Sequence, residues 1–267
     1  MTAAAKERAI TLKTPEELQV MYEANQIVAG VLSMLLQEVK PGLTTWQLDK
    51  WAEEYCRDHG AEPAFKGYRG FPASLCVSIN EQVVHGIPSK RVHVRDGDIV
   101  SVDFGTCYKG FYGDSAVTIP VGSIDERTKS LLEVTEKALY RAIDQVRVGN
   151  RIADVSRAVQ EYVEERGFSV VREFVGHGIG NQLHEAPEVA NYVQKGASPR
   201  LLEGMVIAIE PMVNMGTHKV TVLRDRWTVV TADRQPSAHF EHSVAVTAKG
   251  PFVLSERKAG TTARDNH

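Results

Sequence analysis

The sequence predicts an α/β protein of the α+β type, made of two similar halves whose antiparallel sheets meet around one shared site. An order of two helices followed by strands occurs twice, over about residues 14–120 and again over 123–255. Motifs that contain acidic residues recur in the same order in both halves, inside segments that otherwise resemble buried strands. We therefore expect residues 1–255 to form a single domain, followed by a polar tail over 256–267.

Composition narrows the class of protein. The chain has 267 residues, of which 43% are hydrophobic, enough for a packed core, and its formal net charge is -3 with both signs interspersed. This pattern gives no sign of a nucleic-acid-binding surface. The N-terminus has no apolar signal region and no run is long enough to span a membrane, so we expect neither export nor a membrane anchor. Cys56, Cys76 and Cys107 are widely separated and read as reduced thiols of a cytoplasmic protein.

The first half begins with two predicted helices. Thr14 is the expected N-cap, Pro15 the first helical residue and Glu17 the partner that completes a capping box. An apolar stripe then continues toward the Pro-Gly pair at 41–42, which ends the helix. A second helix is expected over 44–60.

A glycine- and aromatic-rich segment and a short strand lead from these helices to a predicted β-hairpin over residues 96–120. If Lys109-Gly110 is a two-residue turn, Asp103 lies opposite Ala116 and Asp114 lies two positions from that partner on the same face. The separation expected for such a diagonal pair is roughly 7–8 Å. Buried carboxylates need a metal ion or a Lys/Arg partner, and the hairpin alone leaves both alternatives open.

The second half repeats the first. Two further helices are expected over about 131–143 and 152–163, and three motifs then match in order. DGDIVSVD at 96–103 matches EGMVIAIE at 203–210, DSAVT at 114–118 matches EHSVA at 241–245, and HGIP at 85–88 matches HEAP at 184–187.

The repeat gathers four carboxylates, and one histidine without a counterpart stands between glycines in GHGIG at 176–180. Four converging carboxylates cannot all ionise without cations. Together with the imidazole they suit two divalent ions about 3.5–4 Å apart, which acidify a bridging water and stabilise a tetrahedral oxyanion. We therefore predict metal-assisted hydrolysis, with Mn, Fe, Co or Zn as candidate ions. The absence of thiolate ligands argues against a structural zinc site.

These motifs together resemble those of type I methionine aminopeptidase: VDFG, GDSA, GHGIG, IEPM, HFEHSV, NEQVVHGIP and NQLHEAP, spread over about residues 12–255. The resemblance implies the pita-bread fold, a curved antiparallel sheet flanked by helices. It implies a cytoplasmic metalloaminopeptidase that removes the N-terminal methionine from nascent proteins when the second residue is small, using a water activated by a dinuclear metal site. A monomer is the default expectation, and the ribosome is a candidate partner.

The resemblance also implies a role for each of the five metal-ligand positions in this chain. By analogy with the family, Asp103 binds one metal ion, while Asp114 and Glu241 bridge two. His177 and Glu210 complete the other ion, and Glu210 is also a candidate acceptor for the proton of the attacking water.

Other positions correspond to the family's substrate contacts. His85 and His184 resemble the histidines that lie near the scissile amide, although either alone would more often be an ordinary polar loop residue. The implied methionine pocket, for which core packing is the alternative, consists of Phe65, Tyr68, Phe71, Cys76, Leu183 and Trp227. Phe65 stands where some relatives have a smaller residue. Asn80 and Ser237 are candidate ligands of a structural monovalent cation, as in some relatives.

Competing interpretations come from the same fold. Proline-directed relatives such as prolidase usually carry an extra N-terminal domain, whereas about 14 residues precede the first predicted helix here. The type II enzyme has a large insert between the last two carboxylates, and the interval from Glu210 to Glu241 is too short for it. Members without peptidase activity have lost ligands, and all five are present in this chain.

Overall fold

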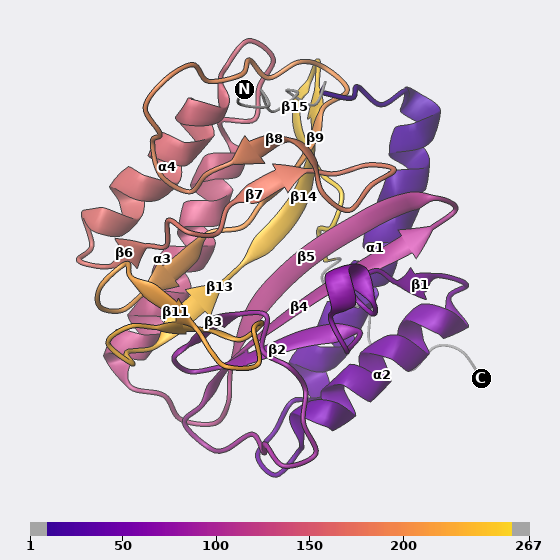
Figure 1. Ribbon diagram of the computed structural model, residues 1–267. Coiled ribbons are helices and arrows are strands. Elements are labelled where there is room, and N and C mark those ends of the chain that lie inside the picture. The colour runs from indigo at the N-terminus through magenta and orange to yellow at the C-terminus, as the bar shows by residue number, and fades with distance from the viewer. Residues whose placement is uncertain (1–9, 258–267) are drawn as a thin grey trace, which may run out of the picture.

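A computed structural model describes residues 10–257 (Figure 1). Its helices are α1 (Pro15–Glu38), α2 (Thr45–Asp58), α3 (Glu126–Ile143) and α4 (Ile152–Glu164), with a 3-10 turn η1 (Tyr68–Gly70). The predicted start of α1 is confirmed, because the Thr14 hydroxyl accepts from the Glu17 N–H and the Glu17 carboxylate accepts from the Thr14 N–H. Thr44 and Gln47 cap α2 in the same way.

Nine strands form one curved antiparallel sheet, in the order β1-β4-β5-β14-β9-β7-β8, with β2 paired to β4 and β15 to β14. These strands are β1 (Glu62–Pro63), β2 (Leu75–Ile79), β4 (Ile99–Tyr108), β5 (Phe111–Pro120), β7 (Gly176–Gly178), β8 (Glu185–Val189), β9 (Val206–Ile209), β14 (Glu241–Thr247) and β15 (Gly250–Val253). Two three-stranded sheets contain β3 (Gln82–Val84), β6 (Ser169–Val170), β10 (Met212–Asn214), β11 (Val220–Val222), β12 (Val229–Thr231) and β13 (Ser237–His239).

The centre of the large sheet joins the two halves. The hairpin of β4 and β5 has the predicted register, with Tyr108 opposite Phe111 and Asp103 opposite Ala116. On its other side β5 pairs with β14, so that Ala116 also lies opposite Glu241. The order β4-β5-β14-β9 therefore sets the two strands that carry acidic motifs in the first half beside their counterparts in the second.

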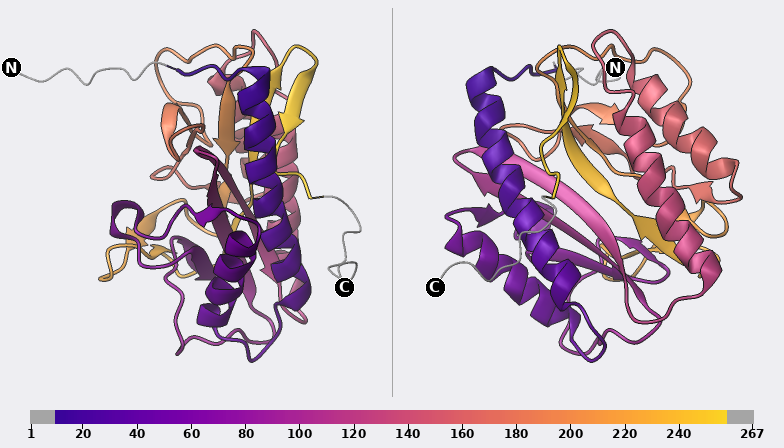
Figure 2. Two further views of the ribbon diagram at one scale, coloured as in Figure 1. Left: turned by 90° about the vertical axis from the view of Figure 1, so that its right-hand side faces the viewer. Right: turned by 180° about the vertical axis from the view of Figure 1, so that it is seen from behind.

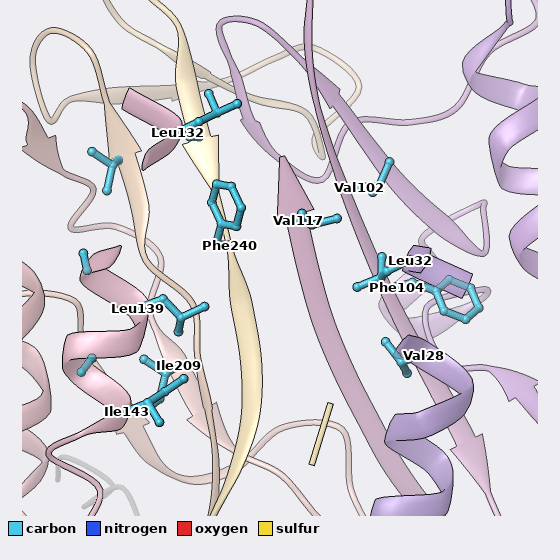
Figure 3. Packing of buried hydrophobic residues seen from close by; sticks show 14 of the residues in the cluster. Val28, Leu32, Val102, Phe104, Val117, Leu132, Leu139, Ile143, Ile209 and Phe240 are labelled. Carbon is cyan, nitrogen blue, oxygen red and sulfur yellow. The ribbon is translucent and has the colours of Figure 1, made fainter. Parts of the chain in front are cut away.

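Helices α1 and α3 cover the same face of this sheet (Figure 2). Their apolar sides pack into one continuous core. Figure 3 shows Leu32 of α1 near Phe104 of β4, and Ile143 of α3 near Ile209 of β9. Each half thus buries its sheet under a long helix of its own, as the predicted fold class requires.

The predicted tail lies outside the described residues from position 258 onward. Within residues 10–257, no helix is both long and apolar enough to cross a membrane.

Candidate metal and active site

One cavity of about 140 Å³ opens beside the centre of the large sheet. Every residue to which the sequence assigned a divalent-metal, catalytic or substrate role lines this cavity, and Arg69 joins them, whereas the candidate monovalent-cation ligands Asn80 and Ser237 lie outside it. The lining residues are Phe65, Tyr68, Arg69, Phe71, Cys76, His85, Asp103, Asp114, His177, Leu183, His184, Glu210, Trp227 and Glu241.

The sheet brings the five proposed ligands together from five neighbouring strands. Asp103 lies on β4, Asp114 on β5 and Glu241 on β14, while Glu210 directly follows β9. His177 lies on β7, the next strand of the sheet, and pairs with Ala208 of β9. Because these strands are hydrogen-bonded neighbours, residues far apart in the chain reach one cavity wall.

The distances agree with a metal-binding cluster. Ligand atoms of Asp114, His177 and Glu241 all lie within 4.8 Å of one another. His177 Nε2 lies 3.9 Å from Asp114 Oδ2 and 3.6 Å from Glu210 Oε1. The His177 Nδ1 atom is 3.0 Å from the Gly178 carbonyl oxygen. If Nδ1–H donates to that carbonyl, Nε2 carries the lone pair and faces the carboxylates.

Buried carboxylate oxygens in this cluster lack protein partners. Among the described residues, Asp103 Oδ1, Asp114 Oδ1 and Glu241 Oε1 are buried without a hydrogen bond. Burial raises the pKa of Asp103 to about 7, and burial followed by the charges of Glu241 and Asp103 raises that of Asp114 well above its usual range. Burial also raises the pKa values of Glu210 and Glu241 well above the ordinary value. Unpaired acidic oxygens beside an imidazole fit divalent cations. A bound cation would give these oxygens a partner and would favour the ionised form of the carboxylates.

Two further histidines lie at the cavity wall. His184 Nδ1 is 2.9 Å from the Tyr68 hydroxyl, and the His184 ring lies 4.1 Å from the His177 ring, between centroids. His85 has a φ of 60° and meets the Trp227 ring edge-on. Burial lowers the pKa of His184 to about 3 and that of His85 to about 4, so both rings are neutral near pH 7.

The rest of the wall is mainly apolar. The six residues predicted for a methionine pocket belong to one hydrophobic cluster, either buried in it or packed against it. Phe71 and Trp227 meet edge-to-face, with 5.1 Å between centroids. Burial raises the pKa of the Cys76 thiol well above its ordinary value, so Cys76 behaves as a small apolar group here.

Arg69 is the lining residue that the sequence analysis missed. It has a φ of 49° within the 3-10 turn, between Gly67 and Gly70, both of which also have positive φ. Its guanidinium lies 5.3 Å from the centre of the Tyr68 ring. The two flanking glycines were a signal of this tight turn, but nothing in the sequence indicated which side chain the turn would aim at the cavity.

Asn80 and Ser237, the candidate monovalent-cation ligands, lie next to each other, because the Ser237 N–H donates to the Asn80 carbonyl at 2.9 Å. The Asn80 side chain already donates to Asp98 and accepts from the Ile99 N–H. The Ser237 hydroxyl donates within the protein as well.

Comparisons with known proteins agree with this geometry. The model of metallopeptidase family M24 matches residues 19–248. A methionine aminopeptidase of Clostridium perfringens (strain 13) is 50% identical over 92% of this chain and 98% of that protein. Methionine aminopeptidase 1 of Bacillus subtilis (strain 168) is 51% identical over 92% of this chain and 99% of that protein.

Solved structures give the same result. The crystal structure of a methionine aminopeptidase from Thermotoga maritima has a TM-score of 0.91 at 45% identity, covering 93% of this chain and all 100% of that one. A prolidase from Pyrococcus furiosus shares the fold at a TM-score of 0.75 and 24% identity, and the match covers only 66% of that longer chain. The chain therefore belongs to metallopeptidase family M24 and, within it, to the methionine aminopeptidases, which are metal-dependent hydrolases.

Proposed function

We propose that this protein removes the N-terminal methionine from nascent polypeptides whose second residue is small, at a dinuclear metal site. The observation that carries the proposal is the union, in one cavity, of five potential metal ligands with an apolar wall and two neutral histidines. Hydrolysis of a peptide bond uses the metal ligands and the histidines, whereas selection of an unbranched thioether side chain uses the apolar wall.

Asp103, Asp114, His177, Glu210 and Glu241 would hold two divalent ions, which supply Lewis-acid polarisation of the scissile carbonyl and acidification of water. Glu210 would accept a proton from the attacking water, since its carboxylate lines the same cavity and lies 3.6 Å from His177 Nε2.

His184 acts at the leaving nitrogen. When the Tyr68 hydroxyl donates to His184 Nδ1, the neutral ring keeps its one hydrogen on Nε2. That N–H is then a donor for the peptide nitrogen as the bond to carbon breaks. His85, which meets Trp227 edge-on and lines the same cavity, offers a second imidazole to the substrate backbone.

The apolar wall selects the first residue. The methionine side chain would lie against Phe65, Phe71 and Trp227, with the Cys76 thiol also in the pocket wall. These rings line a cavity of about 140 Å³, and an apolar wall of this kind suits an unbranched thioether side chain. We expect a β- or γ-branched first residue to fit less well between these rings.

The decisive experiment measures release of the first residue from Met-Ala-Ser, Met-Leu-Ser and Leu-Ala-Ser peptides by chelator-stripped protein, with and without Mn²⁺ or Co²⁺. We expect metal-dependent cleavage of Met-Ala-Ser alone. Equal cleavage of Met-Leu-Ser would contradict the preference for a small second residue. Cleavage of Xaa-Pro peptides in place of Met-Ala-Ser would transfer the assignment to a proline-directed activity.

Metal number needs a separate measurement. Titration of the stripped protein with Mn²⁺, followed by calorimetry and elemental analysis, should reach two ions per chain, and saturation at one would contradict a dinuclear site. The proposal also includes a monomeric cytoplasmic protein that meets its substrate near the ribosome. A structural monovalent cation at Asn80 and Ser237 remains a prediction, and exchange of Na⁺ for Li⁺ with a change in thermal stability would test it.

A further inference from the structure

A buried ion pair lies outside the site described above. The Lys13 side chain is 3% exposed and that of Glu185 is 7% exposed, with 2.6 Å between Lys13 Nζ and Glu185 Oε2. Lys13 belongs to the segment that precedes α1, whereas Glu185 begins β8, so the pair joins opposite parts of the chain. A desolvated pair stays charged only when its geometry is good, and removal of one partner leaves an uncompensated charge.

Glu185 uses both carboxylate oxygens. Its Oε2 atom binds Lys13, and its Oε1 atom accepts from the Gln182 N–H at 3.1 Å. The carboxylate therefore closes the loop over 180–185. His184 lies between the two bonded residues, Gln182 and Glu185, so these contacts restrain its backbone.

Lys13 is itself anchored to the second half of the protein. Its backbone N–H donates to the Gly204 carbonyl at 2.7 Å, in the turn before the strand that leads to Glu210. The ammonium group is completed by the Thr11 carbonyl at 3.2 Å. The segment at 11–13 thus links the His184 loop to the turn before β9.

The ion pair packs directly against Gly180, where a side chain would not fit. A Cβ atom added at Gly180 would lie 2.6 Å from Lys13 Nζ and 2.6 Å from Glu185 Oε1, closer than real Cβ contacts occur. Gly180 is the last glycine of the GHGIG motif, and the absence of its side chain leaves room for the ion pair.

We propose that the Lys13–Glu185 ion pair is a positioning element that holds the 180–185 loop so that His184 meets Tyr68 and stacks near His177. This inference rests on the proposed function of His184 at the leaving nitrogen. Lys13 lines no part of the cavity, so it acts through His184 and not on the substrate. Because a misplacement of about 1 Å can cost roughly 100-fold in rate, loosening this loop should lower kcat by about 10- to 100-fold.

The test compares three variants, Lys13→Met, Glu185→Gln and the double variant, in metal-saturated protein on Met-Ala-Ser. Each should lose kcat by about 10- to 100-fold with KM changed less than about threefold and with metal content unchanged. The double variant buries no unpaired charge, so it should regain thermal stability relative to Lys13→Met while its kcat stays low. Recovery of kcat together with stability would overturn the positioning role in favour of a purely structural one.

Two measurements follow the loop directly. Amide hydrogen exchange of metal-free protein should increase over 180–189 in the double variant and stay unchanged over the hairpin 99–120. In ¹⁵N-histidine spectra the His184 Nδ1 signal should shift as its hydrogen bond with Tyr68 weakens. Unchanged exchange and an unchanged His184 signal would contradict the proposal even if activity fell.

Two controls separate this inference from the proposed function. Lys109→Met removes the exposed pair with Glu23 and should leave kcat unchanged. His184→Ala should lower kcat by about 10²–10⁴-fold with metal retained. If His184→Ala has no effect, the role proposed for His184 fails. If His184→Ala is slow but the double variant is as fast as wild type, only the positioning inference fails.

Discussion

The two halves of the sheet contribute to the cavity in different ways. In the first half β2 flanks β4, and its Cys76 lies opposite Asp103. In the second half β7 flanks β9 in the corresponding place, and its His177 lies opposite Ala208. The strand that flanks each half of the sheet centre thus reaches the cavity with a different side chain, an apolar thiol in the first half and an imidazole in the second. The first half supplies more of the apolar wall, whereas the second supplies the nitrogen ligand.

The halves also differ in the sequence separation of the two strands that carry their acidic residues. Strands β4 and β5 are consecutive and pair along their whole length from Ile99–Pro120 to Tyr108–Phe111. Strands β9 and β14 pair over four positions only, and four short strands lie between them in sequence. The first pair of carboxylates is therefore set by a hairpin, while the second pair depends on closure of a long segment.

The largest expected effect tests whether both halves are equally necessary. Asp103→Asn removes a ligand from the first half and Glu241→Gln one from the second, and each should abolish detectable turnover of Met-Ala-Ser. The loss should exceed the 10- to 100-fold typical of residues that only support a ligand. Far-ultraviolet circular dichroism should stay unchanged, since each substitution replaces a buried carboxyl by an amide of equal size. Full activity in either variant would refute the ligand assignment for that half.

A smaller effect concerns His85, the histidine of the first half's HGIP motif, and the pH dependence of stability. Burial lowers the pKa of His85 to about 4, while an unfolded histidine titrates near 6.5. The unfolded state then binds the extra proton first, so the contribution of His85 to the free energy of unfolding is full above about pH 6.5 and falls as pH drops toward 4. The His85→Gln variant of metal-stripped protein should show a flatter acid dependence than wild type in urea melts. Parallel curves for the two proteins would show that His85 does not titrate this way.

The smallest effect concerns the second helix of each half. Thr44 caps α2 with its side chain, whereas Arg151 at the equivalent position of α4 offers no acceptor. Thr44→Ala should lower the free energy of unfolding by about 1 kcal/mol, because an N–H at the helix start loses its partner. Arg151→Ala should cost less, since its loss is the bond from the guanidinium to the Ser198 carbonyl. Urea denaturation of both variants checks the order, and an equal or larger loss at Arg151 would reverse it.

The two halves also differ in how much of their structure the sequence predicts. The register of the hairpin could be derived from Lys109-Gly110 alone, because a two-residue turn fixes which residues face each other. No local rule placed Glu241 opposite Ala116, and the repeat predicted only that the four carboxylates converge. Arg69 and the Lys13–Glu185 pair were not predicted, since a turn's aim and a contact between distant segments depend on tertiary packing.

Ala116 has a consequence for how the protein matures. It lies opposite Asp103 on one side and Glu241 on the other, so the spacing of these ligands is two interstrand steps of about 4.8 Å each. A one-residue slip between β5 and β14 would turn Glu241 to the opposite face. Loop lengths elsewhere can drift without changing that spacing. Under the proposed function, an enzyme that trims unfinished polypeptides stays inactive until its own chain has been made at least as far as residue 241 and joined in register.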